Sequence, residues 1–150
     1  MIMKATKAIE EAFKAQNWSY TVDEHPDGTS SAVITGFDLK CGANVQIFFI
    51  SAADNDVAIR VFKLIHIPAG KEHAAIHLCN DMNCRYRFAK FVASDEHIGI
   101  QMDMPVETQN VGSVCVELLY RLLDIADNAY PVLQKEFGGA PASPNGAERF

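Results

Sequence analysis

The sequence predicts a single α+β domain in which helices flank an antiparallel sheet. Near both ends of the chain, apolar residues recur at intervals of three and four, which is typical of amphipathic helices. Between them, apolar and polar residues alternate in short runs separated by turn residues, which is typical of strands joined by hairpins. The predicted order is helix, strands, helix, two strands, helix. This order lacks the regular strand–helix alternation of a parallel sheet.

The first predicted elements are a helix over residues 2–17 and an extended segment over 18–24. Apolar residues such as Ile9 and Phe13 share one face of the helix. The extended segment ends at His25-Pro-Asp-Gly28, because Pro and Asp-Gly favour turns.

Three apolar strands are expected over 31–39, 44–52 and 57–67, joined by short turns at Cys41-Gly42 and Asp54-Asn55-Asp56. Such tight connections favour an antiparallel meander. The alternation assigns one face of each strand to the core, namely Val33, Thr35, Phe37, Leu39, Val45, Ile47, Phe49, Val57, Ile59, Val61, Ile65 and Ile67.

The second half of the chain predicts a short helix over 71–83, strands over 85–93 and 97–104, and a long helix over 111–136. Pro68 and Gly70 separate the short helix from the preceding strand. The long helix carries a wide apolar stripe. Pro131 lies inside it and is expected to kink or loosen its last turns.

The length and the charge limit the classes of function. The 150 residues correspond to about one domain. We assign residues 1–137 to this domain and expect 138–150, rich in Gly, Pro, Ala and Ser, to be disordered. The net charge of −6 argues against binding to nucleic acid or to an anionic membrane surface.

The absence of a signal-peptide pattern and of a membrane-length apolar run favours the cytoplasm. In that compartment the four cysteines are expected to be reduced thiols, at least two of them in the core.

Three stretches of the sequence resemble the YbjN-like family of bacterial domains and the wider type III secretion chaperone-like fold. They are Leu78-Cys-Asn-Asp-Met-Asn83, the hairpin formed by residues 87–92 and 98–105, and Ala126-Asp-Asn-Ala-Tyr-Pro-Val-Leu133. The order of elements agrees over residues 5–137. Two departures are the extended apolar hairpin over 44–67 and Ala129, where a second aromatic residue is expected.

This resemblance implies a dimeric, non-enzymatic module that binds a protein or peptide and in some members has a regulatory role. It supplies no catalytic site. Asn80 and Asn83 have two interpretations, ligand contact or local hydrogen bonding to the backbone. We favour the second, because Asn side chains readily bond to nearby backbone groups.

The sequence contains no catalytic motif, and we expect no cofactor. Gly-x-Gly-x-x-Gly, Gly-x-Ser-x-Gly and Cys-x-x-Cys are all absent. His73 and His77 are four residues apart on a predicted helix, so both rings could reach one metal ion, and Asp81 continues this row. The alternative is a polar stripe that faces solvent. We favour the stripe and assign no metal site.

The face of the sheet opposite the core, called the second face below, is unusually apolar and cationic. Two explanations remain open: a helix covers part of it, or it is an exposed patch that contacts a partner. Aromatic and Arg side chains together are typical of binding hot spots. The predicted partner-binding residues on this face are Phe48, Arg60, Phe62, Leu64, Arg85, Arg87 and Phe91.

We therefore predict a non-enzymatic protein- or peptide-binding module, chaperone-like or regulatory, that acts as a homodimer in the cytoplasm. The aromatic side chains would bury apolar groups of the partner, and the Arg side chains would select acidic or carbonyl-rich segments. A sheet edge could also accept an extended peptide. The alternative is a metal- or small-ligand-binding sensor that uses the His73/His77 helix face.

Overall fold

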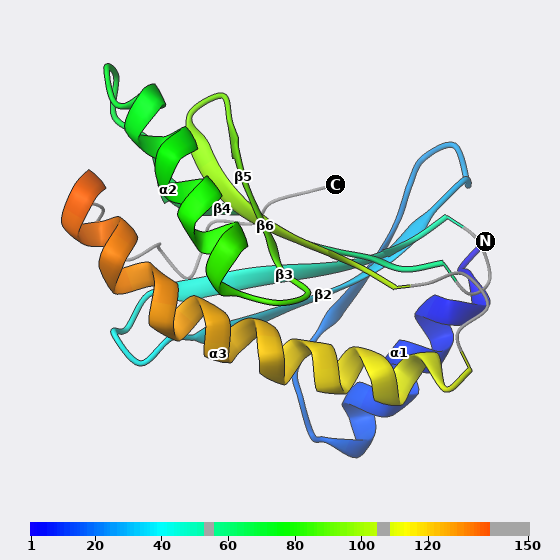
Figure 1. Ribbon diagram of the computed structural model, residues 1–150. Coiled ribbons are helices and arrows are strands. Elements are labelled where there is room, and N and C mark those ends of the chain that lie inside the picture. The colour runs from blue at the N-terminus through cyan, green and yellow to red at the C-terminus, as the bar shows by residue number, and fades with distance from the viewer. Residues whose placement is uncertain (53–55, 105–108, 139–150) are drawn as a thin grey trace.

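The computed structural model describes residues 1–52, 56–104 and 109–138. These residues form an α+β fold with a six-stranded antiparallel sheet and helices in the predicted order, so the predicted fold class is confirmed (Figure 1). The elements are α1 (Lys4–Ala15), β1 (Thr21–Glu24), β2 (Ser31–Asp38), β3 (Asn44–Ser51), β4 (Ala58–His66), α2 (Glu72–Arg85), β5 (Lys90–Ser94), β6 (His97–Asp103) and α3 (Val111–Phe137).

The strands lie in the order β1-β2-β3-β4-β6-β5. Strands β2, β3 and β4 form the predicted meander, and β1 extends it by pairing with β2. Helix α2 connects β4 to the last hairpin, which is formed by β5 and β6. In this hairpin β6 pairs with β4, and β5 lies at the outer edge.

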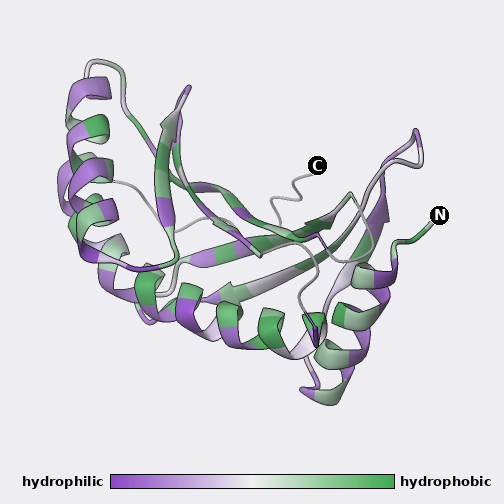
Figure 2. Cartoon of the chain, turned by 45° about the vertical axis from the view of Figure 1, so that its right-hand side comes forward, coloured by the Kyte–Doolittle hydropathy of each residue, from purple (hydrophilic) through white to green (hydrophobic). Residues whose placement is uncertain are grey.

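Helices α1 and α3 pack side by side on the face of the sheet that the alternation assigned to the core. Figures 1 and 2 show both helices along this face, and α2 lies beside β5 near the sheet edge. The Phe13 ring of α1 packs edge-on against two other rings. Its centroid lies 5.1 Å from that of Trp18 and 5.2 Å from that of Phe49 in β3. Gly112 permits the close approach of the two helices, because a Cβ there would lie 2.6 Å from the Ala8 carbonyl oxygen.

The predicted core residues of the three apolar strands, including Val33, Ile47 and Ile59, are buried, except Phe37, which is partly buried against the core. Two cysteines fill the core as predicted: Cys79 of α2 and Cys115 of α3 are buried. Burial raises the pKa of the Cys79 thiol to about 11 and that of the Cys115 thiol to about 12. Both side chains therefore remain protonated and act as small apolar groups.

A β-bulge in β4 breaks the predicted alternation of this strand. Val61 pairs with Ile100, but Ile65 pairs with Ile98, so three residues of β4 lie opposite Gly99. Gly99 is needed here, because a Cβ would lie 2.5 Å from the Val61 carbonyl oxygen. The bulge turns Leu64 into the core, and the prediction that Leu64 lies on the second face is wrong.

The predicted strand over 85–93 is also wrong in its first half. Helix α2 continues to Arg85, and β5 begins only at Lys90. Between them, Phe88 has a φ of 69°, a left-handed conformation that interrupts an extended chain. With this start, Phe91 pairs with Ile100 and is buried in the core, so its assignment to the second face is wrong.

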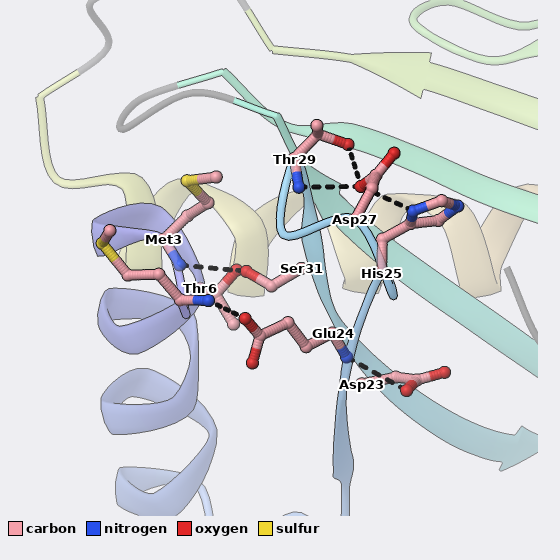
Figure 3. A network of polar contacts seen from close by, with 9 residues as sticks. Met3, Thr6, Asp23, Glu24, His25, Asp27, Thr29 and Ser31 are labelled. Atoms are coloured by element: carbon pink, nitrogen blue, oxygen red, sulfur yellow. Dashed lines mark hydrogen bonds and ion pairs between the residues drawn. The ribbon is translucent and has the colours of Figure 1, made fainter.

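A network of polar contacts holds the start of α1 against the start of β2 (Figure 3). The Met3 backbone N–H donates a hydrogen bond of 3.0 Å to Ser31 Oγ, which lies 2.8 Å from Thr6 Oγ1. The N-terminal amino group of Met1 pairs with Glu24 at the end of β1. These contacts fix the helix relative to the first two strands.

Two further expectations concern the C-terminal part of the chain. Helix α3 ends at Phe137, one residue beyond the predicted end at 136, and Pro131 lies inside it as predicted. The predicted disordered tail falls almost entirely on residues 139–150, which lie outside the described residues. Within the described ranges, none of the helices is both long enough and apolar enough to cross a membrane.

Candidate functional site

The second face is the side of the sheet turned away from α1 and α3. Strand pairing places one continuous row of side chains across it, from β2 to β5. We call this the cross-strand row, and it consists of Ile34, Phe48, Arg60, Gln101 and Lys90. The described helices α1 and α3 pack on the other face of the sheet. Of the two explanations for the apolar second face, coverage by one of these helices is therefore ruled out.

An aromatic pair forms the apolar part of the second face. Phe48 and Phe62 pack edge-on with ring centroids 5.1 Å apart. Phe62 is 41% exposed, whereas Phe48 is fully buried. Phe62 can therefore contact a partner directly, while Phe48 supports its ring from below. Ile34 of the neighbouring strand β2 and Ile50, two residues further along β3, flank Phe48, and both are partly buried.

Arg60 lies beside Phe48 but is already engaged. Its guanidinium group donates hydrogen bonds to Asp103 Oδ1 at 2.8 Å and to the Ile59 carbonyl oxygen at 2.9 Å. A longer bond of 3.3 Å reaches the Met102 carbonyl oxygen. The ion pair with Asp103 reduces the positive charge that a partner would meet here. Arg60 consequently offers a planar, fixed surface more than a free charge.

The predicted partner-binding residues therefore do not form one site. Phe48, Arg60 and Phe62 meet on the second face. Leu64 and Phe91 belong to the core, as described above. The predicted places of two arginines on the sheet are wrong, because Arg85 is the last residue of α2 and Arg87 lies in the following loop. The cause is the late start of β5.

Lys90 and Gln101 are not among the predicted partner-binding residues. Strand register places them in the same row as Phe48 and Arg60. Another pair revealed by register is His66 and His97, whose ring centroids are 5.4 Å apart. No local pattern could have indicated these neighbours, because the partners are distant in sequence and the bulge changes the spacing.

The side chains on the histidine face of α2 do not have the arrangement that a metal site requires. His77 Nε2 lies 3.5 Å from Asp81 Oδ2, which is the spacing of an exposed i,i+4 ion pair. Across the part of the chain that the structure describes, no three His, Cys, Asp or Glu side chains are placed to hold a metal ion.

Asn83 of α2 has a structural contact that agrees with the interpretation of local backbone bonding. Its side-chain amide both accepts from and donates to the backbone of Phe91 in β5. On the same side of the molecule, the Arg121 guanidinium group of α3 lies 5.1 Å from the centre of the Phe88 ring. These contacts tie the helices to the β5 end of the sheet.

The comparisons with known proteins give one clear result. No curated protein matches the sequence. Residues 35–145 match the sequence model of a family described as T3SS (YopN, CesT) and YbjN peptide-binding chaperone 1. This match begins within β2 and includes β3 to β6 and all of α2 and α3. It confirms the resemblance found in the sequence, and because it extends over most of the chain, the chain belongs to this family of peptide-binding chaperones.

Proposed function

We propose that this protein is a non-enzymatic binding module, chaperone-like or regulatory, that holds a segment of another polypeptide on the second face. We further propose that it acts as a homodimer in the cytoplasm. Membership in a family of peptide-binding chaperones supports the general role. The choice of surface depends on Phe62, a large aromatic side chain that is 41% exposed on the sheet face opposite the helices.

The proposed contact is the burial of an apolar side chain of the partner against Phe62. Large apolar groups on an exposed sheet face are typical of protein-binding surfaces. Phe48 fixes the Phe62 ring from below, so little side-chain freedom is lost when a partner binds. Backbone amides of an extended partner could bond to polar groups at the margin, such as Gln101, which is partly exposed.

The test compares two exposed phenylalanines on different surfaces. Phe62→Ala removes the proposed contact, whereas Phe88→Ala removes an exposed ring beside α3 and serves as the matched control. Both variants and the unaltered protein are incubated with an array of immobilised, unstructured peptides. We expect Phe62→Ala alone to weaken binding by about tenfold, as for the loss of an aromatic contact of about 1.4 kcal/mol. Equal binding by Phe62→Ala and the unaltered protein would reject this surface.

The homodimer needs a separate measurement. Ile76 of α2, an exposed apolar side chain, offers a contact for a second copy that is distinct from the second face. Light scattering on the purified protein should give the mass of two chains. A single-chain mass at micromolar concentration would remove the dimer from the proposal and leave the peptide-binding surface unaffected.

A further inference from the structure

The cross-strand row changes in character from one side of the sheet to the other. It begins with apolar Ile34 and Phe48 in β2 and β3 and ends with Gln101 and Lys90 in β6 and β5. Phe62 extends the apolar part, because its ring packs on Phe48. The row therefore presents an apolar group and a cation at fixed positions on one face.

Lys90 is the accessible cation of this row. It is exposed at the start of the edge strand β5, and it forms no ion pair with any described residue. Arg60, in contrast, has its charge opposed by Asp103 at 2.8 Å. The charge that can select a bound segment is therefore that of Lys90 rather than that of Arg60.

Strand geometry fixes the separation of the two ends. Phe62 in β4 and Lys90 in β5 are two strand spacings apart across the sheet, because β6 lies between them, and Phe62 lies two residues along β4 from Arg60 of the row. Two spacings and a step of two residues along the strand correspond to a diagonal of about 12 Å. An extended peptide covers this distance in about four residues. Residues four apart in an extended chain also point to the same side, so both side chains would face the sheet.

From this row we infer the chemical class of the bound segment: an extended stretch with a large apolar residue and an acidic residue four positions apart. The segment crosses the strands, with its apolar side chain on Phe62 and its carboxylate at Lys90. This inference rests on the proposed function, and it adds to it a charge preference and a spacing. A segment with a basic residue in place of the acidic one meets Lys90 with like charge and binds more weakly.

The test uses two synthetic peptides in an uncharged Ser/Gly/Thr background, one with Phe and Glu four positions apart and one with Phe and Lys. Dissociation constants are measured by NMR titration of the isotope-labelled full chain at low salt. The Glu peptide should bind about threefold to tenfold more tightly. This is the difference in affinity expected when an exposed ion pair with Lys90 is replaced by a contact between like charges. Lys90→Glu should reverse this order, and high salt should abolish the difference. Lys135→Glu, an exposed change at the end of α3, is the control that leaves the order intact.

The outcomes separate this inference from the proposed function. If both peptides bind and Phe62→Ala weakens both, but Lys90→Glu leaves their order unchanged, the charge preference is wrong and the binding surface stands. The same holds if Lys135→Glu reverses the order as well. If neither peptide binds to the unaltered protein, both the inference and the proposed surface are rejected.

Discussion

Asn83 of α2 bonds both backbone groups of Phe91 in β5, so that one side-chain amide occupies the place of a neighbouring strand. The Phe91 N–H donates to Asn83 Oδ1 at 2.6 Å, and Asn83 Nδ2 donates to the Phe91 carbonyl oxygen at 3.1 Å. Strand β5 is one of the two outer strands of the sheet. Unpaired groups on such an edge invite pairing with another chain. The contact closes this part of the edge and joins α2 to the sheet.

Replacing Asn83 should therefore weaken the α2–β5 contact. We expect Asn83→Ala to lower the free energy of unfolding by about 1–3 kcal/mol, because it leaves backbone groups of Phe91 without partners. Amide hydrogen exchange at Phe91 should become faster. Asn80→Ala, an exposed change on the same helix, is the control. Urea unfolding measures both variants, and equal stabilities would contradict the role of Asn83.

Gly99 should tolerate no side chain, because of the bulge in β4. A Cβ at this position would lie 2.5 Å from the Val61 carbonyl oxygen, so the Gly99→Ala variant must displace the backbone. We expect a loss of about 1–3 kcal/mol in the free energy of unfolding. Gly36→Ala is the matched control in β2, where the nearest atom to a Cβ is Asn44 Oδ1 at 3.5 Å. Thermal unfolding of the two variants should differ clearly, and similar melting temperatures would count against the bulge.

Two serines that pair across β2 and β3 should respond in opposite directions to loss of the hydroxyl group. Ser31 Oγ is hydrogen-bonded to Met3 and Thr6, whereas the buried Ser51 Oγ finds no hydrogen-bond partner in the described part of the chain. Ser31→Ala should cost about 1–3 kcal/mol, because it leaves a buried partner unsatisfied. Ser51→Ala should be neutral or stabilise the fold by about 1 kcal/mol. Destabilisation by both changes would show that Ser51 has a partner after all.

Asp27 should contribute to acid sensitivity. Hydrogen bonds from the Thr29 hydroxyl and backbone N–H, followed by that from His25, lower the pKa of its carboxyl group to about 2 (Figure 3). The folded state therefore holds the proton less tightly than the unfolded chain, whose Asp pKa is about 3.9. The resulting stability is present above about pH 4 and is lost as the pH falls towards 2.

Melting temperatures of the unaltered protein and of Asp27→Asn measure this effect. The difference between the two should be constant above about pH 5 and shrink at lower pH. An NMR titration of the Asp27 carboxyl group gives an independent check. A midpoint near the ordinary Asp value would contradict the hydrogen-bonded loop.

Local pattern was sufficient for the elements that form from neighbouring residues. Helix α1 and strands β2, β3 and β6 lie within the predicted ranges, because their apolar periodicity coincides with their burial. The exceptions lie where a backbone irregularity interrupts the period. The bulge at Gly99 moved Leu64 to the core face, and the left-handed Phe88 delayed β5. Neither feature has a periodic signal in the sequence.

The sequence by itself determined the α+β class, the order of the elements, the family and the core face of the first strands. Each of these depends on local periodicity or on residue identity along the chain. Only the tertiary structure decided which side chains share the second face, because strand register brings Phe48, Arg60 and Lys90 together from distant segments. A shift of one residue in register exchanges the two faces of a strand. Pairing between strands, which no single segment encodes, therefore selected the candidate site.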